Sequence, residues 1–349
     1  MTSAEPLSAI FERLIAHAGP ISVAHYMGEA NARYYASRDP LGAAGDFVTA
    51  PEISQMFGEL IGLWLTDLWT RAGKPDRVHY VELGPGRGTL ARDALAVAQH
   101  FGLSPQVHLV EGSPALRDAQ RQLLPQAQWH DDLSSVPTDA PLLLVANEFL
   151  DALPVRQLVM TESGWRERMV GFHEGRFAPV AGQKPMDAAV PEDRREAMPG
   201  TIIETCPGAS AVMEDVALRI ASQGGGALFI DYGYAESANG SSLQAVRAHQ
   251  KVDPFTAPGE ADLTALVDFA ALVPVVKGAG CRWLGTVPQG QWLRAMGIDA
   301  RTEALSRAVP DQAEALRAAR DRLTAPEQMG DLFKVFGLTA ADWPEGAGF

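Results

Sequence analysis

The chain has 349 residues, of which 46% are hydrophobic, and a formal net charge of −14, so it can bury the core of one large domain or of a domain with a second lobe. The negative charge argues against a nucleic-acid partner, because phosphate binding needs a basic face, but it does not exclude a basic peptide substrate. The sequence shows no C-x-x-C pair, bilayer-length apolar run or signal peptide, so we expect a cytoplasmic protein of bacterial type without a metal site or membrane segment.

The first 70 residues are expected to form an N-terminal helical cap. Apolar residues recur at helical spacing over 6–17, and the segment 21–35 has the pattern of a second helix that carries several aromatic side chains. Gly19 and Pro20 separate the two helices.

A polar, glycine-rich loop then leads into a third helix, which begins at Thr49 or Pro51. This loop and helix entry could form a lid over a cofactor, which Asp46, Thr49 and Gln55 would then contact. Thr49 could equally be an ordinary helix cap, and the spacing alone does not decide between the two interpretations.

The segment 78–90 reads as a strand, a tight glycine-rich turn and a helix. The turn consists of Gly84, Pro85, Gly86, Arg87 and Gly88. Its G-x-G-x-G spacing differs from the G-x-G-x-x-G that seats a dinucleotide pyrophosphate. Glu82, just before the turn, would repel a phosphate and attract an ammonium group. A zwitterionic ligand such as S-adenosyl-L-methionine (SAM) therefore fits better than a nucleotide diphosphate, although these residues alone also fit a plain turn.

A second strand, 106–110, ends in Glu111, roughly 20 residues or slightly more after the glycine turn, where nucleotide-binding sheets hold a ribose diol. A carboxylate accepts two hydroxyl protons side by side. A helix over 115–124 and a short third strand over 126–129 follow. Asp131, after that strand, would face the adenine amino group, or it belongs to a solvated surface pair.

The continuous apolar run 141–146 predicts a central strand that is buried on both faces. Asn147, Glu148 and Asp151 follow it, at the edge of the sheet where ligands bind. If Glu148 and Asp151 shared a helical turn, they could hold a guanidinium group and fix one nitrogen toward a methyl donor. The alternative is an acidic pair that caps the next helix.

The rest of the chain alternates strands and helices, which predicts an α/β fold with a mainly parallel, doubly wound sheet over 71–349. A β-rich insertion is expected at about 155–200, with two or three antiparallel strands in 156–180 and an exposed excursion in 181–200. The later predicted elements are a strand at 202–203, helices over 209–222, 263–273, 291–296 and 303–323, and strands over 227–230, 281–286 and 332–336.

Four stretches resemble the MidA-like family of class I SAM-dependent methyltransferases, related to a mitochondrial complex I assembly factor that methylates an arginine. They are G-D-F-V-T-A-P-E-I-S-Q-M-F-G-E-L (45–60), V-E-L-G-P-G-R-G-T-L (81–90), N-E-F-L-D-A-L-P-V (147–155) and P-G-E-A-D-L-T-A-L-V-D-F (258–269). The resemblance implies a seven-stranded Rossmann-like sheet with an antiparallel last strand. It also implies that Gly84, Gly86, Gly88 and Glu111 bind SAM and that Glu148 lies at the substrate end.

This chain departs from the pattern of the family at 241–249, where Val246 replaces an expected tyrosine and His249 is kept. The favoured hypothesis is a protein arginine methyltransferase that acts on a peripheral-arm subunit of respiratory complex I and supports assembly of that complex. The alternatives are an assembly factor that binds SAM without catalysis, or a small-molecule O- or N-methyltransferase.

Overall fold

The computed structural model describes residues 5–37, 49–247 and 250–349, and the chain divides into two compact units. The larger unit consists of Leu41–Leu150, Ser210–Glu236 and Val267–Phe349. The smaller unit consists of Met1–Pro40, Asp151–Ala209 and Ser237–Leu266. This division differs from the expected boundary at residue 70, because the segment after residue 49 packs into the core of the larger unit through Phe57, Ile61 and Trp64.

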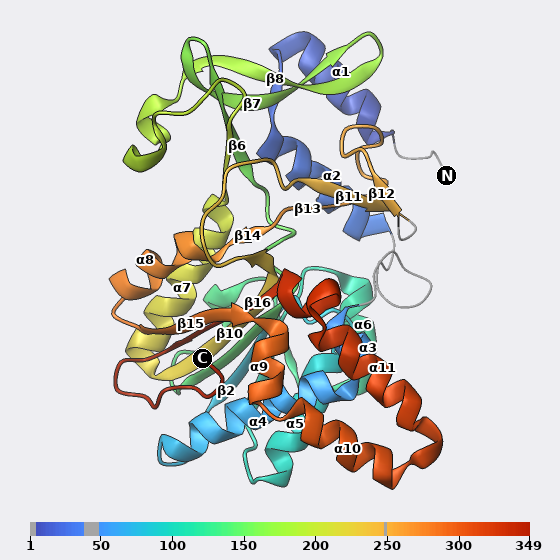
Figure 1. Ribbon diagram of the computed structural model, residues 1–349, viewed down its shortest axis with the longest axis vertical. Coiled ribbons are helices and arrows are strands. Elements are labelled where there is room, and N and C mark those ends of the chain that lie inside the picture. Colours follow the sequence, from blue (N-terminus) through green and yellow to red (C-terminus); the bar gives the residue numbers. More distant parts are fainter. Residues whose placement is uncertain (1–4, 38–48, 248–249) are drawn as a thin grey trace. The chain divides into compact units, whose positions relative to one another are not determined.

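The larger unit alternates strands and helices along most of its length (Figure 1). Its first elements are α3 (Ala50–Ile53), α4 (Gln55–Arg71), β2 (His79–Leu83), α5 (Thr89–His100), β3 (Gln106–Val110), α6 (Pro114–Leu123), β4 (Gln128–His130) and β5 (Leu142–Asn147). The later ones are α7 (Pro207–Gln223), β10 (Gly225–Tyr234), β14 (Val267–Asp268), α8 (Phe269–Gly278), β15 (Arg282–Pro288), α9 (Gln289–Ala295), α10 (Ile298–Ala308), α11 (Ala313–Thr324) and β16 (Phe333–Thr339).

The main sheet has the strand order β15-β16-β10-β5-β2-β3-β4, and the short β14 pairs with β10 as an eighth strand. β10, β5, β2, β3 and β4 run parallel, whereas β16 is antiparallel to both of its neighbours. From β2 the chain first builds outward through β3 and β4, and then returns to place β5 on the other side of β2. This reversal is a topological switch point, and open α/β sheets bind ligands outside the carboxyl ends of the strands at such a point.

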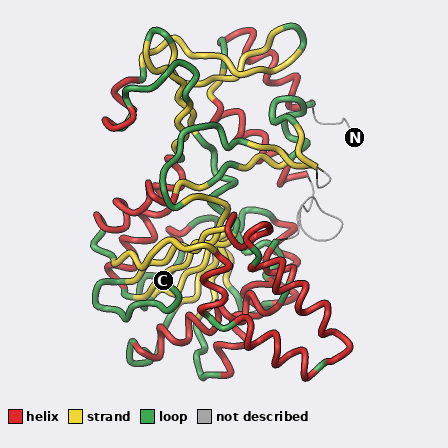
Figure 2. The backbone as a smooth tube through the Cα atoms, viewed as in Figure 1, coloured by secondary structure: helices red, strands yellow, loops and turns green. Residues whose placement is uncertain are grey.

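Helices cover both faces of this sheet, as Figure 2 shows. On one face, α4 and α5 share a buried core with Tyr80 of β2 and Val145 of β5. On the other face, Phe269 of α8 stacks on Phe336 of β16, with ring centroids 5.7 Å apart. Successive side chains of a strand point to opposite faces of the sheet. Each buried strand therefore packs against the helices on both faces.

The smaller unit packs two helices with two small sheets. The helices are α1 (Leu7–Ala18) and α2 (Val23–Ser37). The five-stranded sheet contains β1 (Ile21–Ser22), β6 (Arg156–Thr161), β7 (Gly164–His173), β8 (Arg176–Pro185) and β9 (Ile202–Thr205). The three-stranded sheet contains β11 (Gln244–Arg247), β12 (Gln250–Val252) and β13 (Asp262–Thr264). Phe11 stacks on Tyr26 in the shared core, at a centroid distance of 5.1 Å.

Three predicted elements were placed wrongly. The helix expected over 303–323 is two helices, α10 and α11, which a 3₁₀ turn beginning at Pro310 separates. The helix expected over 263–273 begins only at Phe269, because Asp268 caps it by accepting a hydrogen bond of 3.1 Å from the N–H of Ala271. Ile21 and Ser22 pair with β7 as a short strand before the second helix starts.

A chain of hydrogen-bonded histidines crosses the face of the main sheet opposite Tyr80. Nδ1 of His79 lies 3.0 Å from Nε2 of His108, whose Nδ1 lies 3.0 Å from Nε2 of His130. Asp139 closes the chain at His79, at 2.9 Å, and Ser135 closes it at His130, also at 2.9 Å. Residues 79, 108 and 130 belong to three adjacent parallel strands, so strand register alone brings them together.

Candidate active site

The glycine turn after β2 lies at the switch point of the main sheet. Gly84 has φ +60°, and its N–H donates a 3.0 Å hydrogen bond to the carbonyl oxygen of Val110. A Cβ atom on Gly84 would lie 2.9 Å from the ring of Phe149, so both the backbone angle and the packing require glycine. Gly86 has φ +54°, and Gly88, the residue that precedes α5, has φ +84°. The structure therefore confirms the strand–turn–helix predicted from residues 78–90.

Glu82 lies inside the sheet, and the residue is 2% exposed. Its Oε2 accepts a 2.6 Å hydrogen bond from the hydroxyl of Tyr80. Burial raises the pKa of Glu82 to about 8, and the hydrogen bond from Tyr80 offsets part of that rise. In the protein alone, this carboxyl group therefore keeps its proton at neutral pH, which the sequence did not indicate.

Glu111 follows β3 and is half-buried. Its Oε1 accepts a 2.7 Å hydrogen bond from the N–H of Ser113. Burial raises the pKa of Glu111, while hydrogen bonds from Ser113 and Gln120 lower it. Gln120, on α6, also donates to the carbonyl oxygen of Gly86 at 2.6 Å. Sequence reasoning missed Gln120, because only the folded turn brings α6 beside Gly86.

Asp131 lies after β4, and its side chain is 88% exposed. Its Oδ1 pairs with Nη2 of Arg117 at 2.5 Å, and Arg117 also donates to the carbonyl oxygens of Glu111 and His130. The arginine thus ties the ends of β3 and β4 together. The exposure of Asp131 fits the alternative interpretation, in which it lies on the solvated surface, and its contact with adenine stays a prediction.

The short helix α3 contacts both sides of the switch point. The hydroxyl of Thr89, the first residue of α5, donates to Oε1 of Glu52 at 2.5 Å. The N–H of Ala50 donates to Oε1 of Glu148 at 3.3 Å. Neither contact was predicted, since both join segments that are far apart in the sequence.

The other residues predicted in this segment have separate positions. Thr49 precedes α3, and its side chain makes no capping hydrogen bond there. Gln55 is exposed at the start of α4 and donates to Oε1 of Glu59 at 3.2 Å. Asp46 lies outside the described residues.

Asn147 is the last residue of β5, the strand beside β2, and Glu148 follows it directly. Nδ2 of Asn147 donates to Oε1 of Glu148 at 3.0 Å, and the N–H of Glu148 donates to the carbonyl oxygen of Ile230 at 2.9 Å. Glu148 has φ +50°, a left-handed conformation that is rare outside glycine. Asn147 is 9% exposed, and within the part of the chain that the structure describes its Oδ1 has no hydrogen-bond partner.

Asp231 lies in β10, directly after the residue that pairs with Asn147 of β5, and it holds the loop that follows Glu148. Its Oδ2 accepts hydrogen bonds from the N–H groups of Phe149, at 3.1 Å, and Leu150, at 2.8 Å. Asp231 is 1% exposed, so these bonds are shielded from water. Sequence reasoning missed this role of Asp231, because the N–H groups that it accepts from belong to a distant segment of the chain.

The expectation that Glu148 and Asp151 share a helical turn was wrong. Residues 148–153 form bends and a turn, because the left-handed φ of Glu148 does not continue into an α-helix. Asp151 is the first residue of the second segment of the smaller unit. It is buried there, and its carbonyl oxygen accepts a 3.0 Å hydrogen bond from the N–H of Ala265.

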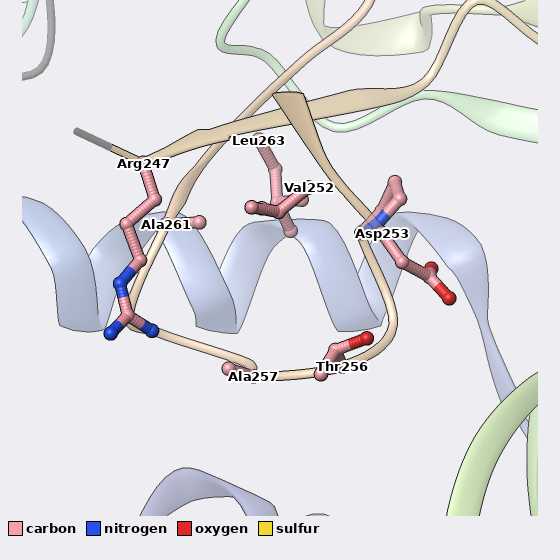
Figure 3. Close-up of a pocket in the computed structure, with 8 residues that line it drawn as sticks. Arg247, Val252, Asp253, Thr256, Ala257, Ala261 and Leu263 are labelled. Atoms are coloured by element: carbon pink, nitrogen blue, oxygen red, sulfur yellow. The ribbon is translucent and has the colours of Figure 1, made fainter. Parts of the chain in front are cut away.

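A hollow of about 90 Å³ lies in the smaller unit and contains none of the predicted site residues (Figure 3). It is lined by Arg247, Val252, Asp253, Pro254, Thr256, Ala257, Ala261 and Leu263. Arg247 at its rim pairs with Glu260 at 3.0 Å. The hollow is too small for a nucleoside ligand, since small-molecule sites span roughly 300–1,000 Å³.

Residues 60–287 match the model of a protein family described as "Putative S-adenosyl-L-methionine-dependent methyltransferase". The chain belongs to this methyltransferase family. The resemblance seen in the motifs is thereby confirmed, and SAM is the methyl donor of this methyltransferase. Among the described residues, no three or more His, Cys, Asp or Glu side chains are grouped to hold a metal ion, and no helix is long and apolar enough to cross a membrane.

Named relatives of the methyltransferase match it over nearly its whole length. It is 37% identical to "Protein arginine methyltransferase NDUFAF7, mitochondrial" of Rattus norvegicus, over 92% of this chain and 81% of the relative. The protein of the same name from Danio rerio is also 37% identical, over 92% and 83%. A crystal structure from Burkholderia thailandensis with bound S-adenosyl-homocysteine is 28% identical with a TM-score of 0.82, and the match covers 95% of this chain and 91% of that one. The α/β methyltransferase fold is thus confirmed.

The switch point of the methyltransferase fits a ligand with a positive charge. Asn147 presents a buried acceptor without a partner among the described residues, and a buried acceptor of this kind is costly unless a donor reaches it. The carboxylates of Glu148 and Glu111 lie at the ends of β5 and β3, on either side of the glycine turn of β2. A sulfonium, an ammonium or a guanidinium suits such surroundings, and a phosphate does not.

Proposed function

We propose that this methyltransferase transfers a methyl group from SAM to an arginine side chain of a protein. The proposal is supported by the names of the relatives and by the polar groups at the end of β5. Methyl transfer breaks the carbon–sulfur bond of the sulfonium and forms a carbon–nitrogen bond, after which the nitrogen releases a proton. The chain must therefore hold the nitrogen in line with the methyl group.

The cofactor is assigned to the carboxyl ends of β2, β3 and β4. The glycine turn would bind the methionine part, Glu111 the ribose diol, and Asp131 the adenine edge. The residues assigned to cofactor binding are Glu82, Gly84, Pro85, Gly86, Gly88, Glu111, Asp131, Asp46, Thr49 and Gln55. The neutral state of Glu82 in the protein alone means that an arriving ammonium would also have to displace its proton.

Residues 49–55 would cover the bound cofactor as a lid. The support is that α3 is anchored on both sides of the switch point, through Glu52 to Thr89 and through Ala50 to Glu148. A segment fixed at these two places spans the gap between the glycine turn and the loop after β5. The other helices of the expected N-terminal cap belong to the smaller unit.

The substrate end is assigned to Asn147 and Glu148, and the observation that carries this assignment is the buried Oδ1 of Asn147, to which no described residue donates a hydrogen bond. A guanidinium offers five N–H donors in a rigid fork, so it can pair with an amide oxygen and a carboxylate together. The left-handed backbone of Glu148, held through Ile230 and Asp231, keeps this carboxylate in one position. Asp151 stays part of the proposal with a smaller contribution to transfer.

A basic protein segment suits a chain whose net charge is −14. Following the resemblance to the MidA-like family, we propose a peripheral-arm subunit of respiratory complex I as the target and support of complex assembly as the role. The cytoplasmic location expected from the sequence belongs to the same proposal, whereas the relatives are named mitochondrial.

The first experiment incubates the purified methyltransferase with isotopically labelled SAM and a lysate of its host. A labelled protein band whose hydrolysate contains methylarginine supports the proposal. Label in the small-molecule fraction, or no label at all despite SAM binding, contradicts it in favour of a small-molecule methyltransferase or a non-catalytic assembly factor.

The second experiment compares Glu148→Gln with Glu314→Gln, a matched change on the exposed surface of α11. Glu148→Gln keeps the size of the side chain but removes the charge that fixes the guanidinium, so transfer should fall about 10²-fold. Affinity for S-adenosylhomocysteine should stay nearly unchanged. Full transfer in Glu148→Gln would defeat the guanidinium assignment, and lost cofactor affinity would make Glu148 a cofactor ligand instead.

A further inference from the structure

The side chain of Gln120 joins three segments of the main sheet that follow one another in the chain. Its Nε2 donates to the carbonyl oxygen of Gly86 at 2.6 Å and to Oε2 of Glu111 at 3.4 Å. Its Oε1 accepts a 2.8 Å hydrogen bond from Nε1 of Trp129. One amide thus links the turn after β2, the acid after β3 and the side chain of a β4 residue.

This amide is fully buried, with 0% of the residue exposed. Removing an amide from water is costly unless hydrogen bonds replace the lost ones. Here both ends of the amide have partners, so the network is satisfied and rigid. The stem of Gln120 also packs on the turn, since a Cβ atom on Gly88 would lie 3.5 Å from Cγ of Gln120.

The contact with Glu111 has an electrostatic consequence. Burial favours the neutral form of Glu111, whereas donation from Gln120 and from the N–H of Ser113 favours the carboxylate. Only the ionised form offers two acceptor oxygens side by side to a diol. Gln120 therefore acts on both the charge and the orientation of Glu111.

We propose that Gln120 is a positioning residue for cofactor binding, which sets the glycine turn and Glu111 in one fixed arrangement. The two ends of the adenosyl amino acid would then meet a preformed site instead of two independently moving loops. This inference rests on the proposed assignment of Gly86 and Glu111 to the cofactor, and it is independent of which group accepts the methyl.

The decisive variant is Gln120→Glu, which has nearly the same shape and places a second carboxyl group beside Glu111. Two carboxylates this close cannot both ionise easily, so the pair should share a proton at low pH and repel at high pH. The other charged or titratable groups near this network are Arg117 and Arg121 on α6, His130 and Asp131 at the end of β4, and Arg87 in the turn.

The control is Gln122→Glu, which adds the same charge to the exposed side of the same helix. Affinity for S-adenosylhomocysteine is measured by calorimetry from pH 5.5 to pH 8.5 for both variants and for the unchanged protein. In Gln120→Glu, affinity should be about 10- to 100-fold weaker at pH 8.5 and should recover toward pH 5.5. Gln122→Glu should follow the unchanged protein at every pH.

A second variant, Gln120→Met, keeps the volume without any hydrogen bond, and it should lose a similar factor at every pH. The positioning role is overturned if Gln120→Glu and Gln120→Met bind like the unchanged protein, or if the loss in Gln120→Glu does not depend on pH. Gly86→Val and Glu111→Ala test the underlying assignment separately. If these two also bind normally, the proposed cofactor site itself is wrong.

Discussion

The hydroxyl of Tyr80 donates a 2.6 Å hydrogen bond to Oε2 of Glu82, and both side chains are buried within β2. Two residues apart on one strand, they point to the same face of the sheet. The bond keeps a carboxyl group satisfied in an apolar layer, where burial alone would be more costly. Glu82 nevertheless has a pKa of about 8, far above the 4.5 of an exposed glutamate.

This raised pKa predicts how stability changes with pH. The unfolded chain loses the Glu82 proton above about pH 4.5, and the folded protein loses it only near pH 8, so stability is fully present at low pH and falls across that interval. Within this interval, the free energy of unfolding falls by roughly 1.4 kcal/mol for each pH unit. Glu82→Gln should remove it, so the variant should be more stable than the unchanged protein at pH 8 and similar near pH 4.5.

Urea unfolding at several pH values measures this difference, with the exposed Glu12→Gln as the control. Equal pH dependence in Glu82→Gln and the unchanged protein would show that Glu82 is ionised in the fold.

The histidine chain predicts the opposite dependence on pH. Burial lowers the pKa of His108 to about 4, with help from the charges of His79 and His130, and burial also lowers the pKa of His130. The unfolded chain binds these protons near pH 6.5, so stability is full above that pH and falls as the pH drops toward 4. His108→Gln keeps a donor and an acceptor without titrating, so its stability should fall less between pH 6.5 and pH 4.

Chemical unfolding at pH 7 and pH 5 compares this variant with His100→Gln, which changes an exposed histidine at the end of α5. A loss of stability in acid that is the same in both variants would contradict the role given to the histidine chain.

The hydrogen bonds of Asp231 predict that its substitution weakens methyl transfer more than cofactor affinity. Asp231→Asn replaces one acceptor oxygen by an NH₂ group, which would face backbone N–H donors and release part of the loop after Glu148. Transfer should fall by about tenfold or more, because reacting groups are then held less firmly. Affinity for S-adenosylhomocysteine should change little. Equal losses in both measurements would place Asp231 in cofactor binding.

The bond between Thr89 and Glu52 predicts the rate at which the cofactor leaves. Thr89→Val removes the 2.5 Å hydrogen bond that anchors α3 to α5. If α3 covers the cofactor, dissociation of S-adenosylhomocysteine should accelerate about three- to tenfold, the order expected for the loss of one hydrogen bond worth about 1 kcal/mol. Stopped-flow displacement measures this rate, and an unchanged rate in a normally folded variant would contradict the lid.

The sequence predicted those parts of the site that depend on residues close together in the sequence. The glycine turn and Glu111 each follow a short apolar strand, and both signals lie within a few residues. Gln120, Asp231 and the histidine chain were missed, because each depends on contacts between residues that lie 29 to 82 positions apart in the sequence. The helical turn assumed for Glu148 and Asp151 failed for the same reason, since β10 holds that loop.

The position of β16 has a consequence for synthesis of the chain. Phe333–Thr339 is a late segment, yet it lies between β10 and β15 in the interior of the sheet. A nascent chain that ends before it leaves unpaired the edges of β10 and β15 that face β16 in the finished sheet, and such edges readily recruit other chains. Emergence of these seven residues from the ribosome is therefore the event that joins β15 to the rest of the sheet. Truncations just upstream should yield aggregated protein rather than a shortened enzyme.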